Sequence, residues 1–206
     1  MHMVIEHSVL KDKICRLRDK NTKRKEVEEL VGEISLLLAY EATRELPLNE
    51  VKVETPIAET TGYLLREGLV IEPIIRAGLS MREAIAKLLP SAKTGHMGLY
   101  RDPEDAHPVE YFCKQPDDCA ERIALVVDSM LATGGSAIKA INMLKEKGCQ
   151  QIIFICIFAA PEGLNALETA HPDVNIYIGA LDQCLNENNF IVPGMGDAGD
   201  RIFGTK

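Results

Sequence analysis

Apolar side chains recur at helical spacing between residues 24 and 46, and glutamates fill many of the positions between them. The members of this apolar face are Val27, Leu30, Val31, Ile34, Leu37, Leu38 and Ala42. The pattern predicts an amphipathic helix, and Pro47 marks its end. Packing against a core or a second subunit is the usual role of such a face, so we expect a structural element here.

Further along the chain, short apolar runs alternate with amphipathic segments. The pattern predicts strands at 69–75, 123–127, 152–158 and 174–180, and helices at 81–89, 137–147 and 164–170. Strand–helix–strand alternation predicts an α/β fold with a mainly parallel sheet flanked by helices. Because ligands bind at the carboxyl ends of the strands in such sheets, the loops that follow the strands are the candidate site.

Composition agrees with one domain, 1–206. The chain is 46% hydrophobic and 26% charged, which is ordinary for a globular protein, and it contains no repeat and no low-complexity tract. The net charge of −8 leaves no broad basic field for a nucleic-acid backbone, so we expect no nucleic-acid partner. An anionic substrate would need a local binding device.

Cysteine usage and the apolar segments indicate a cytoplasmic protein without membrane association. The six cysteines are scattered, with no CxxC pair, which favours reduced thiols over a disulfide framework or a zinc site. The first ten residues mix Glu6 and two histidines with apolar residues, unlike a signal peptide. The longest apolar run, residues 152–160, is too short to cross a bilayer.

The most informative segment follows the second predicted strand and runs from Asp128 to Ser136. Gly134 and Gly135 allow consecutive backbone N–H groups to converge on one anion, and the start of the next helix points at the same place. The Lys of an ATP P-loop and the GxGxxG of a dinucleotide site are both missing. A glycine-rich turn without a ligand is the alternative, but the leading acid and the Thr133 and Ser136 hydroxyls favour phosphate binding.

Residues 128–136 resemble the motif that binds 5-phosphoribosyl-1-diphosphate (PRPP) in type I phosphoribosyltransferases, especially the D-P-M-L-A-T-G-G-S form of uracil phosphoribosyltransferases. The resemblance implies that 132–136 hold the 5′-phosphate and that Asp128 binds ribose. Ser129 stands where the family usually has Pro, so we expect a looser start of the loop without a lost contact. The PRPP-binding residues implied here are Asp128, Ser129, Met130, Leu131, Ala132, Thr133, Gly134, Gly135 and Ser136.

Two other segments resemble cationic parts of the same family. The sequence P-I-I-R-A-G-L is similar to P-I-L-R-A-G-L, which implies that Arg76 contacts the pyrophosphate, a role suited to the planar guanidinium. A surface ion pair is the alternative for Arg76. Glu72 and Ser80 depart from the family pattern, and Glu72 either faces a polar edge or pairs with a nearby base.

Residues 98–112 resemble the flexible loop of the family, G-M-Y-R…P-V-P-Y-F. The resemblance implies a lid that closes over PRPP and brings Arg101 to the diphosphate, which would also keep water from the reacting centre. An ordinary exposed loop is the alternative. Glu110 replaces the usual Pro, a change that would soften the returning strand.

The glycine-rich C-terminal segment would suggest a flexible tail by composition alone. Residues 189–205 are nevertheless similar, almost residue for residue, to the uracil-site segment Y-I-x-P-G-L-G-D-A-G-D-R-x-F-G-T. The resemblance implies a small hood, residues 182–206, in which Ile191, Gly196, Asp197 and Ala198 bind uracil and Asp197 also binds PRPP. Asn189 replaces Gly, and Asn is the residue that best tolerates left-handed backbone angles.

The resemblance covers nearly the whole chain and implies a type I phosphoribosyltransferase-like fold with an N-terminal helical segment, 1–50, packed on it. It implies transfer of the phosphoribosyl group of PRPP to uracil, giving UMP and pyrophosphate, with Arg76, Arg101, Asp128 and Asp197 as catalytic residues. Mg²⁺ would be held mainly through PRPP and water, with Asp197 as the candidate protein ligand. A homo-oligomer (dimer or tetramer) and GTP as an effector are also family properties. The alternatives are a phosphoribosyltransferase for another base and a catalytically weak regulator that senses PRPP or UMP.

Overall fold

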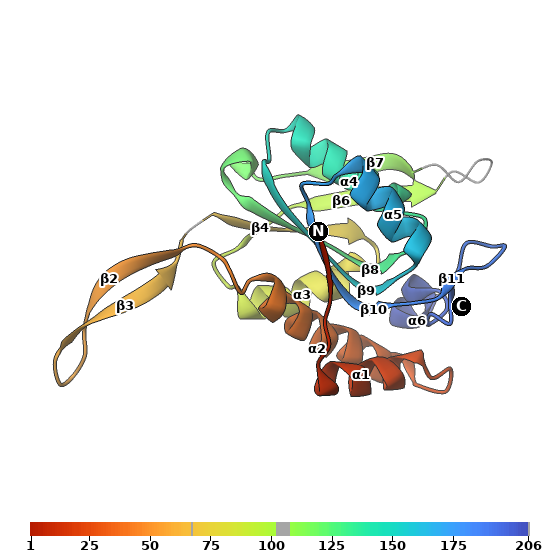
Figure 1. The fold of residues 1–206 in the computed structure, drawn as a ribbon, viewed down its shortest axis with the longest axis horizontal. Helices are drawn as coiled ribbons and strands as arrows, with labels where there is room; N and C mark the ends of the chain where they lie inside the picture. Colours follow the sequence, from red (N-terminus) through yellow and green to blue (C-terminus); the bar gives the residue numbers. More distant parts are fainter. Residues whose placement is uncertain (67, 102–107, 206) are drawn as a thin grey trace.

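The computed structural model describes residues 1–66, 68–101 and 108–205, and the side chain of Arg101 is outside that description (Figure 1). The strands are β1 His2–Val4, β2 Leu48–Glu54, β3 Glu59–Leu65, β4 Leu69–Ile75, β5 Lys93–Thr94, β6 His96–Arg101, β7 Pro108–Lys114, β8 Ile123–Leu131, β9 Gln151–Ala159, β10 Asn175–Leu181, β11 Cys184–Leu185 and β12 Ile191–Val192. The helices are α1 Ser8–Arg18, α2 Arg24–Ala42, α3 Gly78–Leu88, α4 Gly135–Glu146, α5 Pro161–Ala170 and α6 Ala198–Phe203, with a 3₁₀ turn at Cys119–Glu121.

A central sheet has the strand order β1-β10-β9-β8-β4-β6-β7, and β5 lies beside β4. Its neighbouring strands run parallel, except that β6 and β7 are antiparallel. The predicted α/β class with a mainly parallel sheet is therefore confirmed. The four predicted strands and the four predicted helices are all present, with ends that differ by a few residues.

Helices cover both faces of the sheet. Figure 1 shows α1, α2 and α3 along one face and α4 and α5 along the other. Successive side chains of β4 point to opposite faces of the sheet. Ile71 therefore packs in the core under α2 and α3, while Val70 packs in the core under α4. The predicted amphipathic helix is α2, and Ile34 on its apolar face is fully buried. Among the described residues, no helix has the length and apolar character needed to cross a bilayer.

Strand β8 continues past the predicted end at Asp128, so that expectation is wrong. The pairing with β9 runs on through Met130 opposite Phe158 and Leu131 opposite Ala159. The polar pair Asp128-Ser129 looks like the start of a loop, but the hydrogen-bonded ladder is set by the neighbouring strand and not by the side chains. Asp128 is therefore held within a strand at the carboxyl end of the sheet.

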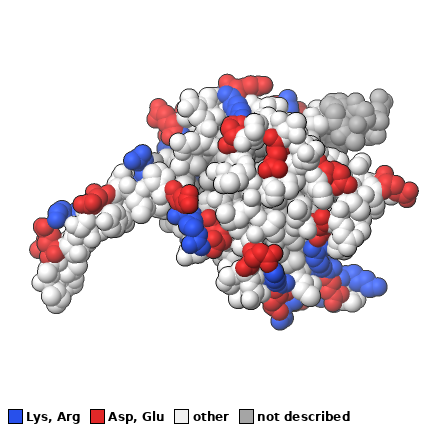
Figure 2. Space-filling model, viewed as in Figure 1, with Lys and Arg blue, Asp and Glu red and all other residues white. Residues whose placement is uncertain are grey.

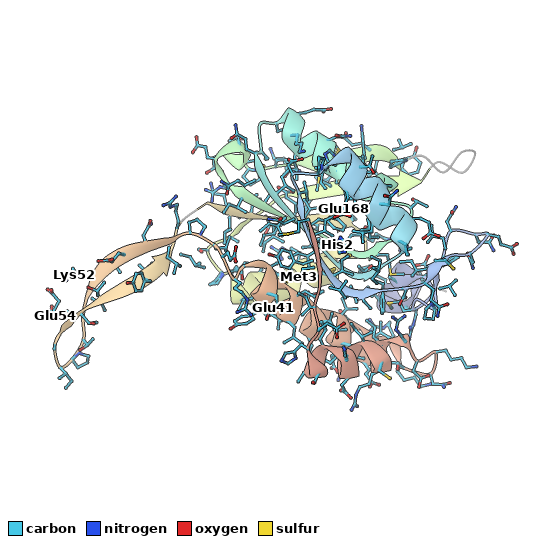
Figure 3. The ribbon with its side chains drawn as sticks, viewed as in Figure 1. His2, Met3, Glu41, Lys52, Glu54 and Glu168 are labelled. Atoms are coloured by element: carbon cyan, nitrogen blue, oxygen red, sulfur yellow. The ribbon has the colours of Figure 1, made fainter. Side chains whose placement is uncertain are left out.

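A two-stranded arm, β2 and β3, projects away from the body of the protein (Figure 1). Its strands pair from Leu48 opposite Leu65 to Glu54 opposite Glu59. The arm was not predicted, because its apolar residues do not face a core: Ile57 at the turn is 93% exposed. At the β1 edge of the central sheet, β1 is held to α5 where the His2 ring lies 3.0 Å from a Glu168 carboxylate oxygen (Figure 3).

Glu72 lies in the middle of the sheet and is fully buried. Both of its carboxylate oxygens and the Gln115 side-chain oxygen lack hydrogen-bond partners among the described residues. These three oxygens surround Gly95, where an added Cβ would come within 2.4 Å of each of them. Burial raises the pKa of Glu72 to about 8, against the opposing effects of Gln115 and the Lys147 charge. Glu72 is thus mainly a neutral carboxylic acid at neutral pH. Within the described part of the chain it therefore pairs with no adjacent base, and its burial places it away from any polar edge.

The Glu72→Gln variant should be more stable than the natural chain at neutral and alkaline pH. The folded-state pKa of Glu72 exceeds its unfolded value, so its contribution to stability is complete below about pH 4.5 and is lost as pH rises through 8. An amide has nearly the same shape as the carboxylic acid and avoids the cost of ionising a buried group, so we expect a gain of about 2–3 kcal/mol at pH 8. Urea unfolding between pH 5 and pH 9 measures it. The exposed Glu83→Gln variant is the control, and equal pH slopes in both variants would contradict the assignment.

Candidate active site

A cleft of about 510 Å³ opens at the carboxyl ends of β4 and β8. It is lined by residues 74–77, Leu99, Tyr100, Tyr111, residues 128–130, Ala132, Ser136, residues 188–191 and residues 196–199. Segments that are far apart in the sequence thus meet at the edge of the sheet where parallel α/β folds bind their ligands. The sequence-predicted site residues in this lining are Arg76, Asp128, Ser129, Met130, Ala132, Ser136, Ile191, Gly196, Asp197 and Ala198.

The predicted phosphate loop connects β8 to α4. Gly134 precedes the helix with a left-handed backbone (φ +86°), a conformation that favours glycine. No side chain caps the N-terminus of α4 in the described structure, so its first N–H groups are available to an anion. This geometry suits a phosphate monoester. The loop residues outside the cleft lining are Thr133, Gly134 and Gly135, which continue the turn, and Leu131, whose side chain lies in the core and is 1% exposed.

Helix α5 supports this loop from behind. The backbone N–H of Ala160 donates to the Leu131 carbonyl at 2.9 Å. Gly163, in the first turn of α5, comes so close to the loop that an added Cβ would lie 2.2 Å from the Ala132 carbonyl oxygen. The sequence analysis did not find this support. Its only signal was the run Pro161-Glu162-Gly163, in which a glycine inside a helix indicates a close backbone approach.

Charged side chains converge on the cleft from three elements. Asp128 lies half-buried on β8, Arg76 is exposed just after β4, and Asp197 precedes α6. Arg76 and Asp197 approach one another at Gly199, where an added Cβ would be 3.4 Å from a guanidinium nitrogen and 3.3 Å from a carboxylate oxygen. Opposite charges therefore stand at the side of the cleft where a diphosphate and its cation would lie.

The thiol next to Asp128 is inert. Cys156 lies opposite Asp128 in the strand register and is fully buried. Burial, and then the Asp128 charge, raise the pKa of Cys156 well above that of an ordinary thiol. A thiolate nucleophile at this position is thereby excluded, and the chemistry of the cleft is left to its carboxylates, its guanidinium and its backbone.

The predicted lid corresponds to the antiparallel pair β6–β7. Residues 102–107, between the two strands, and the Arg101 side chain lie outside the described residues. The described parts place Tyr100 and Tyr111 in the cleft wall, with ring centroids 6.3 Å apart. Tyr111 packs on Gly98, where an added Cβ would lie 2.6 Å from its ring. The register of the pair shifts between Gly98 and Leu99, so the strand bends next to the cleft.

The predicted base-binding segment is ordered around β11, β12 and α6. Ile191 and Ala198 are buried, whereas Gly196 is exposed and has a left-handed backbone (φ +83°). Asp197 accepts a hydrogen bond from the backbone N–H of Asp200 at 2.9 Å and so caps α6. Asn189 adopts φ +60°, which confirms the expectation that it replaces glycine at a left-handed position. Residues 188–191 and 196–199 line the cleft, so the segment is part of the folded structure and not a loose tail.

Comparison with known proteins resolves the family. The model of the family described as uracil phosphoribosyltransferase matches residues 4–205. The chain belongs to the uracil phosphoribosyltransferase family. A curated relative of that name from Caldanaerobacter subterraneus subsp. tengcongensis is 56% identical over 204 residues, covering 98% of this chain and 97% of the relative.

Solved structures agree with this family. The AQ2163 protein from Aquifex aeolicus is 32% identical, with a TM-score of 0.95 over 100% of this chain and 99% of that one. The APRTase from Giardia lamblia has 12% identity and a TM-score of 0.52 over 74% and 80% of the two chains, which shows a shared fold. The type I phosphoribosyltransferase fold implied by the sequence is thus confirmed.

Ser129 stands where the uracil phosphoribosyltransferase pattern usually has proline, and the structure shows the environment of this substitution. It lies within β8, fully buried, and its hydroxyl has no partner among the described residues. The start of the phosphate loop is therefore strand and not the looser loop expected from serine. Proline has no backbone N–H to donate in the strand, but it also has no side-chain hydroxyl that would be buried without a hydrogen-bond partner.

Proposed function

We propose that this cleft transfers the phosphoribosyl group of PRPP to uracil, giving UMP and pyrophosphate. One observation carries the proposal: Ala132 and Ser136 at the two ends of the phosphate loop line the same cleft as Ile191 and residues 196–198 of the base segment. A sugar phosphate anchored in the loop would hold its anomeric carbon between that loop and the base segment. A phosphoribosyltransferase for another base and a catalytically weak sensor of PRPP or UMP are less well supported, because the family match includes the base segment and because Arg76, Asp128 and Asp197 line the cleft.

The proposed reaction has an attacking base, a ribose and a leaving diphosphate, and each is assigned to different residues of the cleft. Uracil N1 attacks C1 of the ribose, the bond from C1 to the diphosphate oxygen breaks with inversion, the electron pair leaves with pyrophosphate, and the N1 proton is released. Arg76 and Arg101 would stabilise the charge that accumulates on the leaving group. Asp128 would hold the ribose hydroxyls and favour the positive charge that develops on the sugar. Catalysis then rests mainly on positioning and on leaving-group stabilisation.

The donor set of the cleft fits Mg²⁺ that is carried by the substrate. Asp128 and Asp197 offer carboxylate oxygens, the ligands that Mg²⁺ prefers. The described residues contain no group of three His, Cys, Asp or Glu that could form an all-protein cage. We infer that PRPP and water supply most ligands and Asp197 contributes to the site. Bound in this way, Mg²⁺ neutralises the charge of the diphosphate.

The decisive experiment incubates the purified chain with PRPP, Mg²⁺ and one base at a time, and measures nucleotide and pyrophosphate formation. We expect UMP from uracil and little product from hypoxanthine, guanine or adenine. A preference for a purine, or PRPP binding without turnover, would refute the proposal. Addition of GTP to the same assay tests its role as an effector.

Assembly into a homo-oligomer, a dimer or tetramer, belongs to the same proposal. The arm exposes a set of large apolar side chains, Leu48, Val53, Ile57, Tyr63, Leu64 and Leu65, which a second copy of the chain would cover. Lys52 and Glu54 also lie on the arm (Figure 3), and the face in Figure 2 shows both charge signs there without a field of one sign. Sedimentation of the purified chain tests the proposal, and a monomeric mass would refute it.

The six cysteines are free in the structure, which supports a reducing compartment, the cytoplasm. Cell fractionation tests this location.

A further inference from the structure

Three charged side chains, one from the N-terminal helix and two from the segment 182–206, converge on the backbone of Gly194 and Met195. Arg18 ends α1, Asp182 follows β10, and Arg201 lies in α6. We call these three residues the polar clasp. None of them lines the cleft, so they do not touch a ligand bound there. Their hydrogen bonds instead end on the backbone of Gly194 and Met195, which immediately precede the residues proposed to read uracil.

The first half of the polar clasp fixes Gly194. Arg18 donates to both carboxylate oxygens of Asp182, at 2.9 and 2.5 Å, and also to the Gly194 carbonyl at 2.9 Å. Asp182 in turn accepts from the Gly194 N–H at 2.9 Å. Both backbone groups of Gly194 are thus held by one ion pair. Gly194 has a left-handed backbone (φ +55°), and an added Cβ would lie 2.2 Å from the Ile191 carbonyl oxygen, so the turn has little freedom.

The second half joins the same turn to the end of α1. One Arg201 nitrogen donates to the Met195 carbonyl at 2.9 Å and to the Leu17 carbonyl at 2.7 Å. The other terminal nitrogen donates to the Asp19 carbonyl at 2.7 Å. These last two carbonyls lie at the C-terminus of α1, where the helix leaves acceptors unsatisfied. A single guanidinium therefore ties the N-terminal helix to the base segment.

The burial of the polar clasp favours a geometric role over a purely stabilising one. The Asp182 side chain is 5% exposed, and the Arg18 guanidinium lies 4.5 Å from the centroid of the buried Phe158 ring. Desolvation of such a pair offsets much of its Coulombic attraction, so apolar residues of similar size would stabilise the fold about as well. Apolar residues would not fix the N–H and the carbonyl of one residue at the same time, as this pair does.

We propose that Arg18, Asp182 and Arg201 are positioning residues that hold the 194–198 backbone in the conformation that reads the pyrimidine. The proposal rests on the proposed function and adds α1 to the machinery of base recognition. Uracil presents alternating carbonyl and N–H groups, so a small rotation of this backbone misaligns more than one hydrogen bond. In the described structure, the hydrogen bonds of the three residues go to one another and to the backbone at 17, 19, 194 and 195, and none goes to the phosphate loop.

The test uses Asp182→Asn and the milder Arg18→Lys in the full-length chain. Lysine keeps the positive charge but loses the paired geometry of the guanidinium. For each variant we expect the KM for uracil to rise about tenfold. The KM for PRPP should rise less, by no more than about threefold, because the phosphate loop is undisturbed and Asp197 is the one proposed PRPP contact within 194–198. Thermal-shift titration with PRPP alone provides a second measurement, and its midpoint should shift by no more than the same factor.

Arg16→Lys is the matched control, since Arg16 lies on the same helix in an exposed pair with Asp12 and should leave both KM values unchanged. Equal rises in both KM values, or a lower melting temperature with unchanged kinetics, would overturn the proposal. A natural chain that made no UMP would refute the proposed function instead. Amide hydrogen exchange across 191–198 would then test whether the polar clasp holds this backbone. Faster exchange in both variants would support that role, and unchanged exchange would overturn it.

Discussion

Replacing Asp128 by Asn should reduce kcat/KM for UMP formation by about 10²-fold, because the variant loses charged hydrogen bonds to the ribose hydroxyls. If Asp128 acts as proposed, the loss should also appear in kcat, since its carboxylate would favour the positive charge that develops on the sugar during bond breaking. Asparagine has the same shape, and the pairing of β8 with β9 at this position uses the backbone. The fold should therefore survive. Steady-state kinetics with both substrates varied measure the effect.

The exposed Asp12→Asn variant controls for a general effect of removing an acid, because its pair with Arg16 lies on the surface of α1. Circular dichroism and thermal unfolding of the Asp128 variant show whether the fold is intact. A folded Asp128→Asn variant with nearly natural kcat/KM would mean that this carboxylate does not hold the ribose.

The sequence predicted the layers of the fold because apolar periodicity reports burial. The strand at 152–158 and the helix that contains Ile34 are recognisable from their patterns, and both are buried as expected. The arm escaped detection for the same reason, since its apolar residues face solvent and give no core pattern. Glu72 could not be placed from sequence, because its environment depends on Gln115 and Gly95, which reach it only through the folded sheet.

For the site, the residues that line the cleft could be predicted from sequence, whereas the residues that support them could not. Asp128 and Ala198 belong to contiguous motifs that were predicted by resemblance, and both line the cleft. The supporting residues were missed. Arg18 and Asp182 are 164 positions apart, and nothing in either local sequence indicates a partner. Motifs show where a ligand is contacted, but the contacts that hold a motif in place come from elements brought together by the sheet.

Gly163→Ala should weaken PRPP binding by about tenfold or more through the phosphate loop, although Gly163 itself is in α5. The new Cβ would lie 2.2 Å from the Ala132 carbonyl oxygen and 2.8 Å from the Leu131 carbonyl oxygen, distances that the backbone cannot accept without moving. A misplacement of even 1 Å in a positioned group costs about 10²-fold in rate. We therefore expect a raised KM for PRPP, a lowered kcat, and a loss of about 1–3 kcal/mol in the free energy of unfolding from overpacking.

Gly32→Ala is a matched control, because the same methyl group is added inside α2, where it would meet the Ala84 side chain at an ordinary 3.6 Å. Alanine is the better helix former, so this control should gain up to about 1 kcal/mol in stability and keep natural kinetics. The Gly163 substitution makes the same propensity gain, so any loss that it shows arises from contact with the loop. A Gly163→Ala variant with the stability and PRPP affinity of the Gly32 control would show that α5 does not set the position of the phosphate loop.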